Sequence, residues 1–385
     1  MRSSKTSKLA ISFLMYLIAG TIVWADESPV ENAKNETILE RFAISKNGDA
    51  LLIPVIIENK EYQFMVDTGC TCSCFDSSFH LGVPQRKILA RTPTGNIEVP
   101  LCRTPNAKIG KLDLLTTGLV FSKDLSFLRK LSGLPIMGLL GMDFLRHHRI
   151  RLDFDRGELL FLSSVSRNCG DRFRLSYEDW VPVLDARIGN SNEVGFELDT
   201  GSVAFASVNL KSRIFNNMLE HKLVTIIGST GSTTVSGSTT TRLASGKASL
   251  KIGSFTLDRP IICESDYNFL GLPFLSRFIV TFDFPNDFCY LKTNKQYSRS
   301  DLMNRSGLGI IRDANKTVIT SVDIGSSAER CLLRAGDLIL KIDGNRSDCL
   351  TMFEIRRILA KRGVALRLNI LRDNQLREVL LELDN

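Results

Sequence analysis

The stretch FMVDTG (Phe64–Gly69) decides the fold, because its last three residues occur a second time, in FELDTG (Phe196–Gly201). Each copy ends an apolar run and is followed much later by a second apolar segment that carries a glycine, LLGMDFL or FLGLPFL. The spacing from the Asp to this glycine is 74 positions in the first copy and 72 in the second. An internal repeat of this size indicates one structural unit used twice, with a carboxylate at the same place in each copy.

The repeated carboxylates, Asp67 and Asp199, are the candidate catalytic residues. Peptide hydrolysis without a metal or a covalent nucleophile needs a base that activates water and an acid that protonates the leaving amine. Two carboxyl groups about 3 Å apart cannot both ionise, so such a pair shares one proton and supplies both roles. The Thr hydroxyls that follow could bridge to the opposite copy, and the Gly N–H groups could donate to the carboxylates. These supporting residues are Thr68, Gly69, Thr200, Gly201 and Ser202.

One Asp-Thr-Gly alone indicates no more than a strand that ends in a polar turn. Two copies at nearly equal spacing, each with apolar segments before and after it, resemble the retropepsin-like and pepsin-like aspartic proteases over residues 45–295. The resemblance implies a mainly β fold, a two-lobed acid-protease pseudodimer with lobe one at 45–166 and lobe two at 167–296. It also implies that each trailing segment forms a strand behind its Asp-Thr-Gly turn. The repeats RIRLDF (Arg149–Phe154) and VTFDF (Val280–Phe284) would be the next strand.

Enzymes of this kind close a hairpin flap over the substrate. In lobe one the resemblance places a flap at TPTGN, with Thr94 and Gly95 as candidate residues. In lobe two it places a flap within IIGSTGSTTVSGSTTT (Ile226–Thr241), with Gly228 and Ser229 as candidates. Taken alone, the second stretch has the composition of a Gly/Ser/Thr linker. Its offset from the second Asp and the apolar run that follows it favour a mobile hairpin.

The first copy departs from the family pattern, because Cys70 stands where the family usually has Ser, Thr or Ala. A thiol hydrogen-bonds a carboxylate poorly, whereas the second copy keeps a hydroxyl at Ser202. We therefore expect an asymmetric pair in which Asp67 is the less strongly ionised member. Cys70 also begins CTCSC, where buried thiols or disulfides are favoured over a metal site, since no CxxC pair or nearby His completes one. The nine cysteines leave at least one unpaired.

The N-terminus predicts an export signal at residues 1–25. Basic residues precede an apolar run, LAISFLMYLIAGTIVW (Leu9–Trp24), and Val23-Trp24-Ala25 is an A-x-A-like cleavage site. The run is short for a membrane span, although an uncleaved anchor stays open. Residues 26–44 are polar in their first part and are predicted to be flexible. The expected location is the periplasm, the cell surface or the medium of a bacterial cell.

The C-terminal residues 297–385 resemble a PDZ domain, a small α+β fold. Gly307-Leu308-Gly309-Ile310 corresponds to the family's carboxylate-binding loop, in which successive backbone N–H groups hold an anion. The segment Thr351–Lys361 would be the helix beside the groove, since its apolar residues recur at steps of three and four. The resemblance implies that the groove binds protein C-termini or internal peptides by adding them as a strand.

Other functional classes are disfavoured by the sequence. The net charge of +7 is spread along the chain, so no block of basic residues indicates nucleic-acid binding. The four His residues belong to no HExxH motif, and no Gly-x-Ser-x-Gly encloses a nucleophile. The motifs require neither a cofactor nor a metal.

The sequence thus predicts an exported aspartic endopeptidase that hydrolyses peptide bonds with a water activated between Asp67 and Asp199. Its PDZ groove would recruit the peptide tails of peptide or protein substrates. The alternative is a non-catalytic scaffold that binds peptides in the cleft and in the PDZ groove, and Cys70 keeps this alternative open. Contact with a membrane is expected only if the signal is uncleaved.

Overall fold

The computed structural model describes residues 36–92, 95–114, 116–203, 206–234 and 237–384. Within these ranges, no helix is both long and apolar enough to cross a membrane. The predicted signal at 1–25, the beginning of the N-terminal segment and the flap residue Thr94 lie outside them. The described chain is mainly β, as the sequence predicts, and its strands form four sheets.

The first large sheet positions the first Asp-Thr-Gly turn, which begins directly after strand β3. Its strand β2 alternates buried and more exposed residues, because one face packs on the core. In sheet order the strands are β5 (Arg86–Thr92), β6 (Gly95–Arg103), β9 (Leu119–Lys123), β4 (Cys74–Asp76), β10 (Ile136–Leu140), β3 (Lys60–Val66), β2 (Leu52–Ile57), β7 (Ala107–Ile109) and β8 (Leu112–Asp113).

The second large sheet contains the second Asp-Thr-Gly, which follows β16, and repeats this strand order. The pairings repeat too: β3 runs parallel to β10, and β16 runs parallel to β23. In sheet order the strands are β18 (Val224–Thr234), β19 (Gly237–Gly246), β22 (Ile262–Ser265), β17 (Val208–Lys211), β23 (Phe269–Leu270), β16 (Val194–Leu198), β15 (Val181–Ile188), β20 (Ser249–Ile252) and β21 (Phe255–Asp258), with β14 (Ser176–Glu178) paired to β15. The sequence repeat is therefore a repeat of structure.

A third sheet combines strands from the two repeats. Its middle strands, β11 and β24, are the predicted RIRLDF and VTFDF segments, and they pair antiparallel with each other. In sheet order the strands are β1 (Ile38–Ala43), β12 (Glu158–Leu162), β11 (Arg149–Asp153), β24 (Phe278–Asp283), β25 (Phe288–Thr293) and β13 (Asp171–Arg174).

Strand β1 corrects the prediction that residues 26–44 are flexible throughout. It pairs antiparallel with β12, and Phe42 packs edge-on against Phe161 with ring centroids 6.1 Å apart. Just before the strand, Glu36 forms an ion pair with Arg151. Burial of the aromatic ring and the charge pair order this segment, although its composition is polar.

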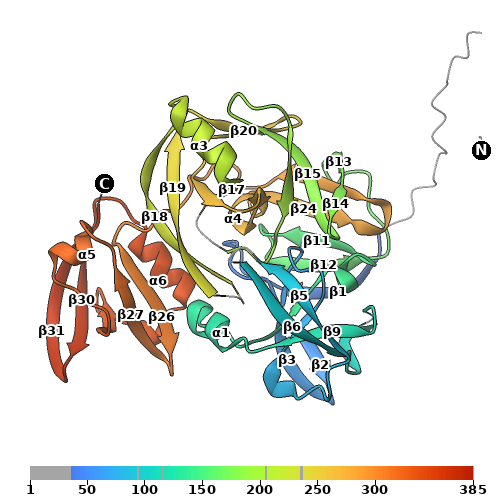
Figure 1. Ribbon diagram of the computed structural model, residues 1–385, viewed down its shortest axis with the longest axis horizontal. Helices are drawn as coiled ribbons and strands as arrows, with labels where there is room; N and C mark the ends of the chain where they lie inside the picture. Colours follow the sequence, from blue (N-terminus) through green and yellow to red (C-terminus); the bar gives the residue numbers. More distant parts are fainter. Residues whose placement is uncertain (1–35, 93–94, 115, 204–205, 235–236, 385) are drawn as a thin grey trace, which may run out of the picture. The chain divides into compact units, whose positions relative to one another are not determined.

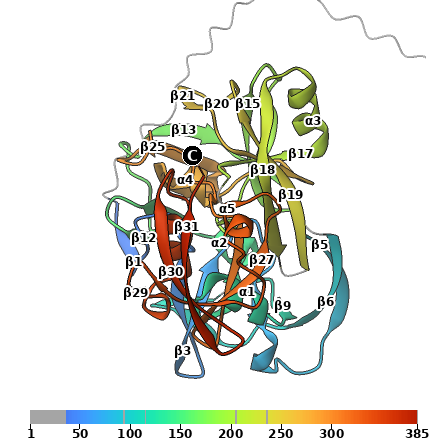
Figure 2. The same cartoon turned by 90° about the vertical axis from the view of Figure 1, so that its left-hand side faces the viewer.

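Six short helical segments accompany these sheets: η1 (Ser77–Phe79), α1 (Ser126–Ser132), α2 (Met142–Leu145), α3 (Ser212–Glu220), α4 (Leu272–Leu275) and η2 (Phe284–Asn286). Two hairpins, β5–β6 and β18–β19, extend from the large sheets (Figures 1 and 2). The Gly/Ser/Thr-rich stretch 226–241 thus contributes to paired strands and is no unstructured linker, since β18 and β19 pair along their length.

The boundary predicted at residue 297 lies too early. The Asp301 carboxylate pairs with the guanidinium of Arg277 at 2.6 Å, and both side chains are almost fully buried. The ring of Tyr297 packs against Phe278, with centroids 5.4 Å apart. Because a buried charge needs a partner, Asp301 is fixed to the second repeat. The PDZ fold therefore begins after residue 301.

The fourth sheet forms the PDZ part, and β26 lies at one end of its strand order. In sheet order its strands are β26 (Leu308–Asp313), β27 (Lys316–Val322), β28 (Leu338–Ile342), β30 (Ala365–Arg372) and β31 (Gln375–Glu382), with β29 (Asn345–Arg346) paired to β28. The helices are α5 (Ser327–Arg330), η3 (Ser347–Cys349) and α6 (Met352–Leu359). Met352, Ile355 and Leu359 of α6 are buried in the core, as their spacing predicts.

Thr351 begins α6 with a capping box. Its hydroxyl oxygen accepts the N–H of Glu354 at 3.1 Å, and the Glu354 carboxylate accepts the N–H of Thr351 at 2.7 Å. Replacing Thr351 with Ala is expected to lower the free energy of unfolding by about 1 kcal/mol, because the N–H of Glu354 loses its acceptor. Denaturant unfolding measures the change. Thr351→Ser keeps the hydroxyl and should resemble the wild type, so an equal loss in both variants would contradict this account.

Candidate active site

The two Asp-Thr-Gly turns occupy equivalent places in the two large sheets, directly after β3 and β16. The N–H of Asp67 donates to the carbonyl oxygen of Leu140 at 3.0 Å. The N–H of Asp199 donates to the carbonyl oxygen of Leu270, also at 3.0 Å. Strands β10 and β23 therefore hold the backbone of the two turns in the same way.

Thr68 and Thr200 join the two turns. The hydroxyl of Thr200 donates to the carbonyl oxygen of Val66 at 2.8 Å, and the hydroxyl of Thr68 donates to that of Leu198. Each hydroxyl oxygen also accepts the backbone N–H of the other threonine, both at 3.0 Å. Both side chains are buried, so water competes little for these four hydrogen bonds, and the turns are fixed against each other.

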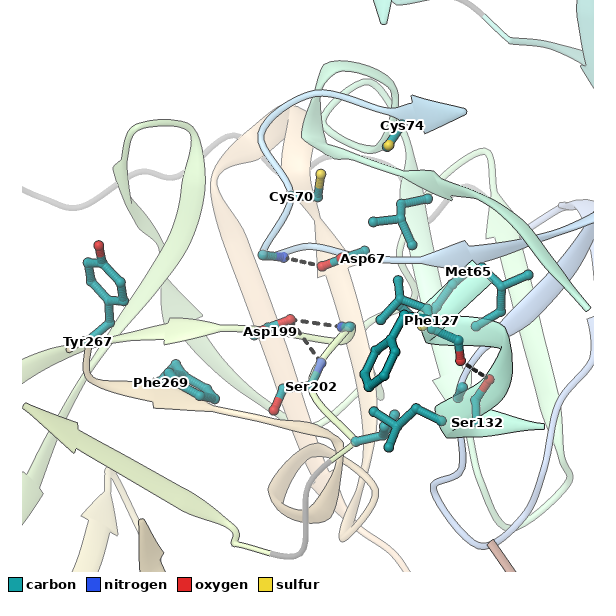
Figure 3. Close-up of a pocket in the computed structure, with 18 of the residues that line it drawn as sticks. Met65, Asp67, Cys70, Cys74, Phe127, Ser132, Asp199, Ser202, Tyr267 and Phe269 are labelled. Atoms are coloured by element: carbon teal, nitrogen blue, oxygen red, sulfur yellow. Dashed lines mark hydrogen bonds between the residues drawn. The ribbon is translucent and has the colours of Figure 1, made fainter. Parts of the chain in front are cut away.

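Asp67 and Asp199 lie across this junction from each other (Figure 3). The N–H of Gly69 donates to Oδ1 of Asp67 at 3.0 Å. The N–H groups of Gly201 and Ser202 donate to Oδ1 of Asp199 at 2.8 and 3.1 Å. A Cβ atom on Gly69 would lie 2.7 Å from Oδ1 of Asp199, and one on Gly201 would collide with the Asp67 carboxylate. Glycine at both positions lets the two carboxylates approach each other.

Burial raises the pKa of both carboxyl groups. It raises the pKa of Asp67 to about 6, although the hydrogen bond from Gly69 favours the charged form. Burial, and then the charge of Asp67, raise the pKa of Asp199 to about 8. Two carboxyl groups this close titrate as a pair, and between these values the pair holds one proton. The site can therefore present a base and an acid at the same time.

The pKa shifts give no support to the expected asymmetry, since burial raises the pKa of both carboxyl groups and the charge of Asp67 raises that of Asp199 further. The thiol of Cys70 hydrogen-bonds the carbonyl oxygen of Cys72 at 2.9 Å, and it points away from Asp67 (Figure 3). The hydrogen bond from Ser202 to Asp199 comes from its backbone N–H. The side chains after the two glycines therefore do not set the order of ionisation.

A third acid, Asp143, lies behind the first turn and is absent from the repeated motif. Its Oδ1 accepts the N–H and the hydroxyl of Ser73 at 2.8 and 2.7 Å, and Ser73 Oγ accepts the N–H of Gly141 at 3.0 Å. Burial raises the pKa of Asp143. This network holds the CTCSC segment. The sequence does contain a sign of this third acid. The first repeat has Asp143 two residues after the glycine of its trailing segment, and the second repeat has Pro273 at the equivalent position.

A cavity of about 1290 Å³ surrounds the two carboxylates, and most of the side chains around them are apolar. Phe127 of α1 lies on one side of the pair, while Tyr267 and Phe269 lie on the other (Figure 3). Hairpin β5–β6 contributes Ile88, Leu89, Ala90, Ile97, Val99 and Leu101. A cavity of this size and lining fits an extended peptide with apolar side chains.

Of the described candidate flap residues, those of the second repeat line this cavity and that of the first repeat does not. Gly228 and Ser229 lie in β18 and line the cavity. Gly95 begins β6, and Thr94 lies outside the described residues. Both hairpins thus contribute to the wall of the cavity through their strands.

The candidate residues of the PDZ loop lie at the start of β26. Gly307 has a φ of +72°, a left-handed conformation that favours glycine, and Leu308, Gly309 and Ile310 begin the strand. All four residues line the same cavity as Asp67 and Asp199. The sequence gives no sign of this proximity, because it depends on contacts between residues far apart in the chain.

All nine cysteines are free thiols in the structure. Cys74 is buried, while Cys70 and Cys72 are partly buried, and burial raises the pKa of all three thiols. The sequence left buried thiols and disulfides open for the CTCSC segment. In the structure its three cysteines are thiols. In the part of the chain that the structure describes, no three His, Cys, Asp or Glu side chains come together as metal ligands.

Comparison with known families gives two matches. Residues 53–144, which include the first Asp-Thr-Gly and its trailing strand, match the family model of an aspartyl protease. Residues 318–372 match the family model of a PDZ domain. None of the curated proteins compared with the chain matches it. The chain therefore contains an aspartyl protease domain and, after it, a PDZ domain.

Proposed function

We propose that the chain is an exported, retropepsin-like aspartic endopeptidase with two lobes. They comprise residues 45–166 and 167–296, together with the segments 36–44 and 297–301, which pack on them. The observation that carries this proposal is the junction of the two Asp-Thr-Gly turns. Thr68 and Thr200 join the turns, and Asp67 and Asp199 line one cavity. The identical strand order of the two large sheets supports a second lobe, although the match to the aspartyl protease model covers part of the first repeat.

The pair would hydrolyse a peptide bond through a water held between the carboxylates. Asp67, with the lower pKa, takes a proton from the water, and the water oxygen attacks the carbonyl carbon. Asp199 donates its proton to the carbonyl oxygen, which gives a neutral diol. Asp67 then protonates the amide nitrogen while Asp199 takes back a hydroxyl proton, and the C–N bond breaks. Both carboxyl groups end in their initial states.

The remaining parts would serve this reaction. The hairpins β5–β6 and β18–β19 would cover an extended substrate and exclude water from the carboxylates. The PDZ groove would bind peptide tails and raise the local concentration of substrate. The N-terminal signal would direct the protein out of the cytoplasm, to the periplasm, the cell surface or the medium.

The test is cleavage of a mixed peptide library by the purified protein, with Asp67→Asn beside it. Loss of cleavage in the variant, with the fold retained, would support the endopeptidase. If the folded wild-type protein cleaves nothing between about pH 3 and pH 9, even with a PDZ-binding peptide present, the proposal is wrong and the peptide-binding scaffold is favoured.

The pH dependence of cleavage follows from the two raised pKa values. Below about pH 6 both carboxyl groups are protonated and no base is available. Above about pH 8 both are ionised and no acid is available. We expect kcat/KM to form a bell with its maximum near neutral pH, because this parameter reports the ionisation of the free enzyme. The measurement uses a peptide without titratable side chains, and an optimum below pH 5 would contradict the raised values.

A further inference from the structure

The cavity that holds Asp67 and Asp199 is continuous with the PDZ loop. Its wall on the PDZ side contains residues 307–310, together with Arg356 and Leu359 of α6. Its wall on the protease side contains Phe127, Leu128 and Leu131 of α1. A peptide end at the loop and a scissile bond at the carboxylates would therefore lie in one cavity.

The PDZ groove lies between β26 and α6. One edge of β26 pairs with β27, and a peptide could pair with the other edge. In the described part of the sheet, β26 pairs with β27 alone. An extended peptide that adds to such an edge places its C-terminus at the loop and its preceding residues along the strand.

The protease domain covers the far end of this groove. The Lys130 ammonium lies 3.1 Å from the Asp313 carboxylate at the end of β26. A Cβ atom on Gly133, directly after α1, would lie 2.7 Å from Cγ of Met352. Phe353 packs into a buried apolar cluster of the first repeat that includes Leu125. A bound peptide can therefore use the loop end of the groove, but it cannot continue along β26 to Asp313.

The open end of the groove offers a cation and an apolar surface to a free C-terminus, and the cavity on this side is also lined by Arg305 and by the carboxylates of Asp323 and Asp384. Arg356 lines it from α6, and the guanidinium donates one hydrogen bond to the carbonyl oxygen of Leu131. Burial lowers the pKa of Arg356 to about 10, which leaves the side chain charged at neutral pH. Apolar Leu308, Ile310 and Leu359 lie beside it. A carboxylate would meet the Arg356 cation beside the loop, where the N–H of Leu308 donates to Oγ of Ser306 at 3.1 Å, and an apolar terminal side chain would meet these residues.

We propose that the substrates are polypeptides with a free C-terminal carboxylate and an apolar terminal residue, which the PDZ loop holds while the dyad cuts the same chain. Because the protease domain covers the far end of the groove, the preceding residues leave β26 and follow α1 toward Asp67 and Asp199. The scissile bond then lies at a set number of residues from the C-terminus. This proposal rests on the endopeptidase function proposed above.

The experiment uses the full chain and peptides built from an Ala-Leu repeat, in two lengths that end in the same Leu. Each length is made as a free acid and as a C-terminal amide, and mass spectrometry locates the cut. We expect kcat/KM for the acids to exceed that for the amides by about 10-fold or more, because the amide loses a charge-assisted hydrogen bond. We also expect the peptides of both lengths to be cut at the same number of residues from the C-terminus.

A pair of variants tests the role assigned to Arg356. In Arg356→Gln the ratio of acid to amide cleavage should fall toward one, whereas a merely structural defect would lower both rates and keep the ratio. Arg362→Gln removes an exposed arginine outside the cavity wall and should keep the wild-type ratio.

The outcomes separate this inference from the function on which it rests. Equal cleavage of acids and amides, or cuts at distances from the C-terminus that differ between the two lengths, would overturn the inference and leave the endopeptidase intact. No cleavage of any peptide by the folded wild-type protein would overturn both. Acid preference with a constant distance, lost in Arg356→Gln and kept in Arg362→Gln, supports the inference.

Discussion

Asp199→Asn is expected to lower kcat by roughly 10³-fold or more, because Asn can neither donate nor take back the proton that the reaction requires. The amide is nearly the same size as the carboxyl group, and its oxygen can still accept the N–H groups of Gly201 and Ser202. The fold should therefore persist. The measurement is single-turnover cleavage at neutral pH, where the pair holds one proton in the wild type.

The same variant should change how stability depends on pH. Burial raises the pKa of Asp199 to about 8, so from about pH 4 to pH 8 the folded wild type binds more protons than the unfolded chain. Wild-type stability therefore falls as the pH rises through this range. The Asn side chain does not titrate. We expect Asp199→Asn to gain on the order of 1–3 kcal/mol relative to the wild type between pH 4 and pH 8.

The control for both measurements is Asp185→Asn, which replaces an exposed carboxylate on β15. It should keep wild-type activity and show no gain in stability at pH 8. Cleavage by Asp199→Asn at more than a tenth of the wild-type rate would contradict the assigned acid. A stability difference that is the same at pH 4 and pH 8 would contradict the raised pKa.

The parts of the fold that follow from local patterns could be predicted from the sequence. The Asp-Thr-Gly repeat depends on residue types at short range, and the strands before it, the trailing strands and the RIRLDF and VTFDF strands all lie where expected. In the PDZ part, the spacing of the apolar residues predicts α6 because 3.6 residues make one helical turn. The proximity of Asp67 and Asp199 followed from the repeat itself.

The features that depend on contacts between distant residues could not be predicted. The polar segment before residue 45 contains β1 because β12 offers a strand edge and Phe161 offers an aromatic ring. Residues up to Asp301 stay with the protease because Arg277 is buried there. The order of the two pKa values depends on burial and on the charge of the partner, whereas the sequence pointed to the side chain of Cys70.

Replacing Thr200 with Val is expected to have the largest effect on stability. Valine keeps the shape of the side chain but removes the hydroxyl, so the carbonyl oxygen of Val66 and the N–H of Thr68 lose their partners. Each unpaired buried group costs about 1–3 kcal/mol, so the loss in free energy of unfolding should be roughly 2–6 kcal/mol. The turns would also shift, and kcat should fall by roughly 10²-fold, as misplacement of reacting groups by about 1 Å can cause.

Urea unfolding and steady-state cleavage measure these two effects, with Thr200→Ser as the matched control. Serine keeps the hydroxyl and should retain most of the activity and stability. Because loss of either hydroxyl lets the two turns shift and so weakens the hydrogen bonds of the other hydroxyl, the double variant Thr68→Val/Thr200→Val should lose less stability than the sum of the single losses. Strict additivity would mean that the two hydroxyls act independently, and the account of one shared network that joins the turns would then be wrong.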